Sequence, residues 1–191
     1  VRLNIIELLS RFNQPDVAQA LERQLKDKNK MVRKAALEAL AAMPGDRDIG
    51  LICSLLADPE LEVQARAVDL VVKLRHPDTM KHLVNVLKDE SEFARRSAVE
   101  VLNEIAEPST IKALLMALED GDWWVRSRAS DALAKIGGPK VMDAVLQLVG
   151  DKNENIRRSA IEILNQTKDE RAVDYLIKAT RDNDWWVRER A

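Results

Sequence analysis

Apolar residues recur along this chain at intervals of three and four, which is the spacing of one face of an α-helix. One such stretch places apolar side chains at Val125, Ala129, Ala132, Leu133 and Ile136. A second stretch follows it directly, with apolar side chains at Met142, Val145, Leu146 and Val149. Both stretches span about three helical turns and are joined by only a few residues. The pattern therefore predicts an all-α chain built from pairs of short helices.

The paired pattern returns every 31 residues, without an insertion or deletion anywhere in the chain. One column of equivalent positions is apolar throughout and consists of Val1, Val32, Val63, Ala94, Val125, Ile156 and Val187. Another column is alanine in almost every unit and consists of Ile5, Ala36, Ala67, Ala98, Ala129, Ala160 and Ala191. A helix pair of this size cannot bury its apolar face alone, whereas stacked pairs form one continuous core. We therefore expect a right-handed α-solenoid of stacked antiparallel helix pairs with a 31-residue period.

We expect residues 1–191 to form a single array of about six repeats. The units start near residues 1, 32, 63, 94, 125 and 156, and a partial unit starts at 185. The first helix of most units follows a residue that caps helices well, and these residues are Asn29, Ser91, Asp122, Asn153 and Asp184. Glu60 interrupts that column. Such a side chain accepts a hydrogen bond from a free amide of the first turn, which contributes about 1 kcal/mol.

The charge balance argues against a dedicated nucleic-acid binder, which normally carries a strong basic excess. The chain has 30 Lys and Arg against 32 Asp and Glu, so its formal net charge is −2. No apolar run approaches the roughly 20 residues that a membrane-spanning helix needs. Cys53 is the only cysteine, so an internal disulfide is excluded, and a cytoplasmic location is the expectation.

The repeat resembles the HEAT-like repeats, in particular those of the bilin-lyase type. The residues that carry the resemblance are DGDWWVRSRASDALAKIGGPKVMDAVLQLVGD at 120–151 and DKNENIRRSAIEILN at 151–165. The resemblance covers the whole chain and implies that the helix carrying Val-Arg-x-x-Ala lines the concave side of the array. It also implies a bacterial protein, of which this chain is a segment.

The same resemblance implies a ladder in which each aspartate pairs with an arginine six residues further on. The pairs are Asp27 and Arg33, Asp89 and Arg95, Asp120 and Arg126, Asp151 and Arg157, and Asp182 and Arg188. We interpret each aspartate as a cap of the turn between repeats, and each arginine as a bridge to a neighbouring repeat. This column is structural, because residues that recur in every unit serve the stacking. Gln64 replaces the arginine opposite Asp58, so a weaker rung with local slack is expected there.

The first helices also carry an acidic column, which consists of Glu7, Glu38, Asp69, Glu100, Asp131 and Glu162. Basic residues precede it by three or four positions, at Lys34, Arg66, Arg96, Arg128 and Arg158. These charges are either ion pairs along one helix face, each contributing a few tenths of a kcal/mol, or a docking surface for a partner. In the second case we expect Arg96, Arg128, Arg158, Glu100, Asp131 and Glu162 to contact a polypeptide.

The two tryptophan pairs, Trp123-Trp124 and Trp185-Trp186, lie two repeats apart in the same context, Asp-Trp-Trp-Val-Arg. Consecutive helical residues cannot both face the core. Trp124 shares its column with Met31, Phe93 and Trp186 and is expected to be the packed member. Trp123 shares its column with Lys30, Glu92, Glu154 and Trp185 and is expected to be exposed. Trp123 and Trp185 are either structural or binding residues, since exposed tryptophan is common at interface hot spots.

No constellation in the sequence indicates catalysis, so we expect a segment without enzymatic activity, metal or cofactor. The only histidines, His76 and His82, have no acidic or cysteine neighbours at metal-ligand spacing. Cys53 occupies a core column with Val84, Leu115, Leu146 and Ile177, so the sequence gives no support for a cysteine nucleophile. A glycine-rich phosphate loop is absent as well.

The function that these observations favour is a protein–protein interaction scaffold. Its partner would be another polypeptide or another domain of the same parent protein, with neither nucleic acid nor membrane involved. A domain or subunit of a bilin lyase or related enzyme is the alternative, and it predicts a bound tetrapyrrole. Neither end of the chain carries a polar cap, so the chain is either part of a longer protein or stacks end to end with other copies.

Overall fold

The computed structural model describes residues 2–12 and 14–191 and is helical throughout this part of the chain. The first helices of the repeats are α1 (Arg2–Leu9), α3 (Lys30–Ala42), α5 (Leu61–Leu74), α7 (Glu92–Ile105), α9 (Trp123–Ile136), α11 (Glu154–Thr167) and α13 (Trp185–Arg190). From α3 to α13, each of them begins 31 residues after the one before. The second helices are α2 (Pro15–Gln24), α4 (Ile49–Ser54), α6 (Thr79–Val86), α8 (Ile111–Ala117), α10 (Gly138–Leu148) and α12 (Val173–Ala179). The fold is an α-solenoid of stacked helix pairs, as the period predicts.

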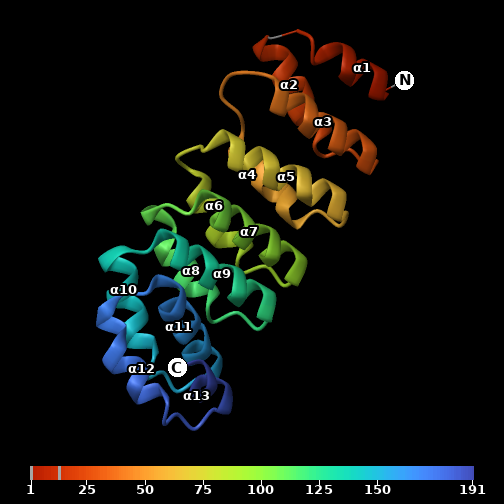
Figure 1. Ribbon diagram of the computed structural model, residues 1–191. Coiled ribbons are helices and arrows are strands. Elements are labelled where there is room, and N and C mark those ends of the chain that lie inside the picture. The colour runs from red at the N-terminus through yellow and green to blue at the C-terminus, as the bar shows by residue number, and fades with distance from the viewer. Residues whose placement is uncertain (1, 13) are drawn as a thin grey trace. The chain divides into compact units, whose positions relative to one another are not determined.

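The helices fall into two compact units, Val1–Val101 and Leu102–Ala191. In the first unit, α3 packs between α1 and α5 and also against its partner helix α2. In the second unit, α11 packs between α9 and α13 and also against α10 (Figure 1). First helices therefore lie beside first helices within each unit, so equivalent residues of successive repeats come onto one face.

Side-chain caps start the first helices where the sequence predicts them. The Asn29 side chain accepts a hydrogen bond from the Met31 amide at 2.9 Å. Asp122 accepts from the Val125 amide at 3.1 Å, and Asn153 and Asp184 cap α11 and α13 in the same way. Glu60, the exception in the column, makes no side-chain cap to α5. The cap column thus sets the phase at which each first helix begins.

The second helices are shorter than the three turns that the apolar pattern suggested. Only α10, with 11 residues, reaches that length, whereas α4 has 6 residues and α12 has 7. Part of the missing length is 3₁₀-helix, which covers Leu55–Ala57, Pro108–Thr110 and Glu170–Ala172. Short 3₁₀ turns are common at helix ends, where they satisfy backbone groups that a tight connection leaves without a partner. Apolar spacing alone does not distinguish the two kinds of turn.

The alanine column lies in the core between neighbouring first helices. Ala36 and Ala67 in the first unit, and Ala129 and Ala160 in the second, are fully buried. Their small side chains allow the helix axes to approach closely, because a longer side chain at the same place would hold them apart. Cys53 is buried in the core as its column predicts, and burial raises the pKa of its thiol to about 12.

The turns between repeats carry the predicted aspartate–arginine ladder. The Asp27 carboxylate accepts the Asn29 amide at 2.8 Å, and Arg33 donates to the Asp27 carbonyl oxygen at 2.9 Å. Arg33 also forms two hydrogen bonds, both of 2.7 Å, to the Asp58 carboxylate of the next repeat. Both side chains of this ion pair are almost completely buried. One arginine thus links the turn that precedes its own helix to the turn of the following repeat.

The ladder recurs in the second unit. Arg157 donates to the Asp151 carbonyl oxygen at 2.9 Å and to both carboxylate oxygens of Asp182 at 2.8 and 2.9 Å. Arg126 and Arg188 donate to the carbonyl oxygens of Asp120 and Asp182, and in the first unit Arg95 donates to that of Asp89. The bond to the aspartate six residues earlier is therefore present in all five predicted pairs.

The Gln64 position is filled rather than slack. The Gln64 amide nitrogen donates to the Asp58 carbonyl oxygen at 2.6 Å, which is the bond that arginine makes elsewhere. Its amide oxygen accepts from the Ser97 hydroxyl at 3.1 Å, and the side chain is buried. A neutral amide thus keeps the contact to its own turn and reaches the next first helix through a hydroxyl group instead of a carboxylate. The weaker rung expected at this position stays a prediction.

Replacing Arg33 with alanine should destabilise the first unit by about 3–5 kcal/mol, because it leaves the buried Asp58 carboxylate without its partner. Arg188→Ala is the matched control, since the exposed Arg188 donates only to the carbonyl oxygens of Asp182 and Asn183 in the described structure. Its loss should cost less than about 1 kcal/mol. Urea unfolding followed by circular dichroism measures both. Equal costs for the two variants would show that the buried ion pair does not hold the repeats together.

Candidate binding surface

The structure brings six of the eight predicted binding residues onto the first helices of one unit. They are Trp123, Arg128, Asp131, Arg158, Glu162 and Trp185, on α9, α11 and α13 of the second unit. α11 packs against both α9 and α13 (Figure 1). The surface formed by these residues of α9, α11 and α13 is here called the first-helix face. The other two, Arg96 and Glu100, lie on α7 in the first unit.

Two large aromatic side chains stand out from the first-helix face into solvent. Trp123 is 66% exposed and Trp185 is 64% exposed, as their column predicts. Each is the first residue of its helix, directly after a capping aspartate, Asp122 or Asp184. Tryptophan side chains are usually largely buried. The caps fix the backbone at these positions, so both rings are presented by an ordered helix end rather than by a loop.

Trp124 and Trp186 are the more buried members of the two tryptophan pairs, as their column predicts, although neither ring is fully buried. Trp124 and Trp186 are half-buried, and Phe93 in the same column is 46% exposed. An arginine of the same helix lies over each tryptophan ring, with the Arg128 and Arg190 Cζ atoms 5.3 and 5.4 Å from the ring centroids. The spacing of four residues brings these side chains together on the helix surface. An arginine therefore covers part of the second ring of each pair.

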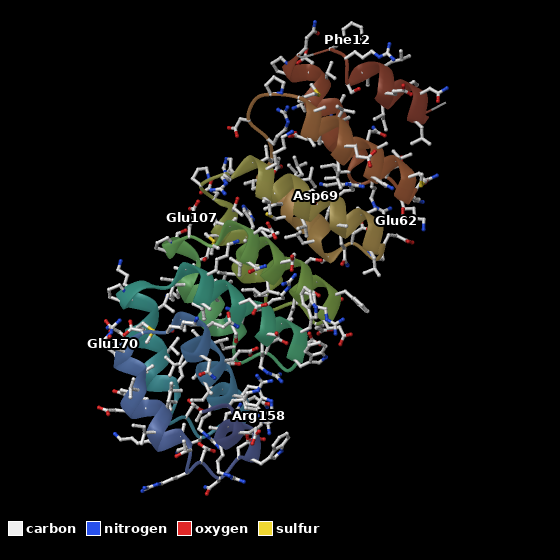
Figure 2. All side chains as sticks on the ribbon, viewed as in Figure 1. Phe12, Glu62, Asp69, Glu107, Arg158 and Glu170 are labelled. Atoms are coloured by element: carbon white, nitrogen blue, oxygen red, sulfur yellow. The ribbon has the colours of Figure 1, made fainter. Side chains whose placement is uncertain are left out.

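Arg158 pairs with the next repeat and not with Glu162 on its own helix. Its guanidinium donates two hydrogen bonds, of 2.9 and 2.6 Å, to the two carboxylate oxygens of Asp184. Figure 2 shows Arg158 reaching toward α13, the helix that Asp184 caps. The two-pronged contact lowers the pKa of Asp184 to about 2. A helical-wheel argument missed this contact because it considers one helix at a time.

The acidic residues of the first-helix face, Asp131 and Glu162, lie on neighbouring helices that pack against each other. Arg128 Nη1 lies 3.7 Å from the Asp131 carboxylate, which makes this a long ion pair. The Gln166 amide donates to the same carboxylate at 3.4 Å. Burial raises the pKa of the neighbouring Glu162, the negative charge of Asp131 raises it further, and Arg190 opposes the rise. The face therefore holds two carboxylates on adjacent helices that repel each other.

Sequence reasoning did not identify Asp184, Arg190, Trp124 and Trp186 as parts of this surface. Asp184 lies 26 residues after Arg158, close to the spacing of 25 that separates the ladder partners Arg157 and Asp182. The sequence therefore contains a signal for the contact between Arg158 and Asp184.

Within residues 2–12 and 14–191, no three histidine, cysteine or acidic side chains gather as metal ligands do. No helix in these same residues is both long and apolar enough to cross a membrane.

Stacked helix pairs in both units, which repeat every 31 residues, define an α-helical repeat protein of the solenoid class. The HEAT repeat family model matches residues 1–51, 49–129 and 111–191, so the chain belongs to the HEAT repeat family. No curated protein matches the chain.

Solved structures share the fold at low sequence identity. Kap95p, from a study of its binding to RanGDP, superposes with a TM-score of 0.64 at 20% identity, over 95% of this chain and 31% of its own. Kap95 in the Kap95:Nup1 complex gives a TM-score of 0.65 at 20% identity, over 96% of this chain and 30% of its own. The E. coli protein YIBA_ECOLI gives 0.52 at 22% identity, over 94% of this chain and 70% of its own. The chain thus spans about a third of Kap95, and these likenesses show the fold alone.

The Arg158–Asp184 pair should make stability depend on pH in the acid range. The folded-state pKa of Asp184, about 2, lies below the unfolded value of about 3.9, so the pair stabilises the protein above pH 4. That stabilisation is lost as the pH falls toward 2. In Arg158→Gln, the urea midpoint should therefore fall less steeply between pH 4 and pH 2 than in the wild type. Arg181→Gln is the control: it removes a charge from an exposed side chain, and its urea midpoint should fall between pH 4 and pH 2 as steeply as that of the wild type. An unchanged slope in Arg158→Gln would contradict the pairing.

Proposed function

We propose that this chain is a protein–protein interaction scaffold that binds a polypeptide partner on the first-helix face and carries out no catalysis itself. The observation that carries the proposal is the exposure of Trp123 and Trp185, at 66% and 64%, in equivalent positions two repeats apart. Tryptophan is the residue most enriched among interface hot spots, because a partner that covers its ring removes a large apolar area from water. The caps at Asp122 and Asp184 hold both rings in place before a partner arrives, which lowers the entropy cost of binding.

The charges of the first-helix face support a polypeptide over a nucleic acid. A nucleic-acid site needs arginines and lysines that are available to phosphates. Here Arg158 is held by two bonds to Asp184, and Arg128 lies between the Trp124 ring and the Asp131 carboxylate. Acidic and basic groups alternate across the face. Such a surface suits a partner with charges of both signs and apolar side chains between them.

The spacing of the two exposed tryptophans sets the size of the partner segment. Packed helix axes lie about 8–10 Å apart, so rings on α9 and α13, with α11 between them, are about 20 Å apart. An extended chain advances about 3.3 Å per residue, so about six residues reach from one ring to the other. Kap95p, which shares the fold, binds RanGDP and is found in a complex with Nup1. A segment of six or more residues is therefore the smallest partner that engages both rings.

Replacing either exposed tryptophan with alanine should weaken partner binding about 30-fold, the effect of losing a hot-spot residue. The probe is a 12-residue peptide selected from a random phage-displayed library on the wild-type protein. Fluorescence polarisation gives its Kd for the wild type, Trp123→Ala, Trp185→Ala and the double variant. Far-UV circular dichroism should show unchanged helicity, because both rings are exposed.

Leu61→Ala is the matched control. Leu61 opens α5 at the equivalent position in the first unit and is 60% exposed, so the variant removes an exposed apolar side chain outside the first-helix face. Its Kd should equal that of the wild type. The proposal fails if the selected peptides bind the double tryptophan variant as tightly as the wild type.

A further inference from the structure

Two pairs of acidic residues occupy equivalent places in the two units, three repeats apart. Glu38 on α3 and Asp69 on α5 form the pair in the first unit. Asp131 on α9 and Glu162 on α11 form the pair in the second unit. In both cases the carboxylates project from neighbouring first helices that pack against each other. The two pairs therefore provide a comparison within one molecule.

A guanidinium group bridges the pair in the first unit. Arg66 Nε lies 3.3 Å from a carboxylate oxygen of Glu38, and Arg66 Nη1 lies 3.0 Å from one of Asp69. The planar fork of arginine suits this arrangement, because its nitrogen atoms point toward two acceptors at once. The repeat geometry itself thus shows which group fits between two carboxylates in these positions.

The second pair has no such bridge among the described residues. The position equivalent to Arg66 is Ser159, which is buried and carries no charge. Arg158 beside it is held by Asp184, and Arg128 reaches Asp131 only at 3.7 Å. The pKa of Glu162 is raised by burial and by Asp131, and Arg190 only partly offsets this. The carboxylates repel each other at the place where an arginine holds the other pair together.

Aromatic rings on α9 and α13 also favour a positive charge. On α9, spacings of four and three residues place Trp124, Arg128 and Asp131 on one stripe of the helix. The faces of Trp124 and Trp186 already hold arginines at 5.3 and 5.4 Å, so guanidinium over tryptophan is an arrangement that this surface adopts. The rings of Trp123 and Trp185 carry no such cation among the described residues and are open to solvent.

We infer that the partner polypeptide places an arginine between Asp131 and Glu162, in the way that Arg66 lies between Glu38 and Asp69, while apolar residues near that arginine cover Trp123 and Trp185. This inference rests on the proposed function, because it names the chemistry of the partner at the same face. Asp131 follows Trp123 by eight residues, about 12 Å along the helix. An extended chain covers that distance in about four residues, so the apolar residues lie three to five positions from the arginine.

The test uses the library-selected peptide. Its arginine should be essential: citrulline, which keeps the shape and loses the charge, should raise Kd at least tenfold. Lysine should restore only part of the affinity, because an ammonium group does not fork across two carboxylates. In the Asp131→Asn/Glu162→Gln variant, the arginine and citrulline peptides should bind with equal Kd. Glu38→Gln/Asp69→Asn makes the same charge change in the first unit and should keep the full preference for arginine.

A second variant supplies the bridging guanidinium from the protein itself. Ser159→Arg places a guanidinium at the position of Arg66 and should weaken the arginine peptide at least tenfold while its helicity is retained. Should this variant fail to fold, the neutralised Asp131 and Glu162 pair decides the question alone. The inference is overturned if the selected peptides lack arginine, if citrulline or lysine binds as well as arginine, or if neutralising Asp131 and Glu162 leaves the preference intact. If those results occur while the tryptophan variants still lose binding, the proposed scaffold function holds and only the arginine in the partner is disproved.

Discussion

The contact between an arginine and two aspartates at the inter-repeat turn is the interaction on which the rest of the structure depends. Arg33 holds the turn before its own helix through the Asp27 carbonyl oxygen and the turn of the next repeat through the Asp58 carboxylate. That carboxylate also accepts the Glu60 amide at the start of α5. A buried ion pair tolerates no loss of a partner, because the remaining charge would lie in a medium of low polarity. The Arg33–Asp58 ion pair thereby fixes the start of α5, the turn before it and the position of the neighbouring repeat.

The first-helix face follows from this constraint. Because the first helices from α3 onward begin at the same phase, residues that recur come to lie beside one another on adjacent helices within each unit. Residues that do not recur in every repeat then give parts of this surface their own character. In alternate repeats an arginine comes directly before the residue of the alanine column, at Arg66, Arg128 and Arg190, and the tryptophan pairs also lie two repeats apart. The residues that stack the helices therefore recur in every repeat, whereas these surface residues recur in every second repeat. The Asp131 and Glu162 pair lies inside one such double unit, between the two pairs of tryptophans.

The sequence predicts the fold more fully than the surface, and particular residues show why. Capping residues act within one turn, and buried alanines act between equivalent positions of neighbouring repeats. The roles predicted for Asn29, Asp122 and Ala129 are therefore the ones that they have in the structure. The exposure of Trp123 could be predicted because its column is otherwise mostly charged. Contacts of long side chains across repeats could not, since a helical wheel gives angles on one helix and not distances to the next. The sequence therefore did not reveal that Arg158 pairs with Asp184 instead of Glu162, or that Arg128 lies over the Trp124 ring.

The central claim is that residues which recur in every repeat hold the stack together, whereas the exposed tryptophans bind a partner. The chain has four tryptophans, so incorporation of 5-fluorotryptophan gives four ¹⁹F resonances that single replacements assign. Titration with the selected peptide should move the resonances of Trp123 and Trp185 most and shield both from a soluble paramagnetic probe. If the peptide saturates the protein while those two resonances keep their shifts and their exposure to the probe, the partner binds elsewhere and the account of this face is wrong.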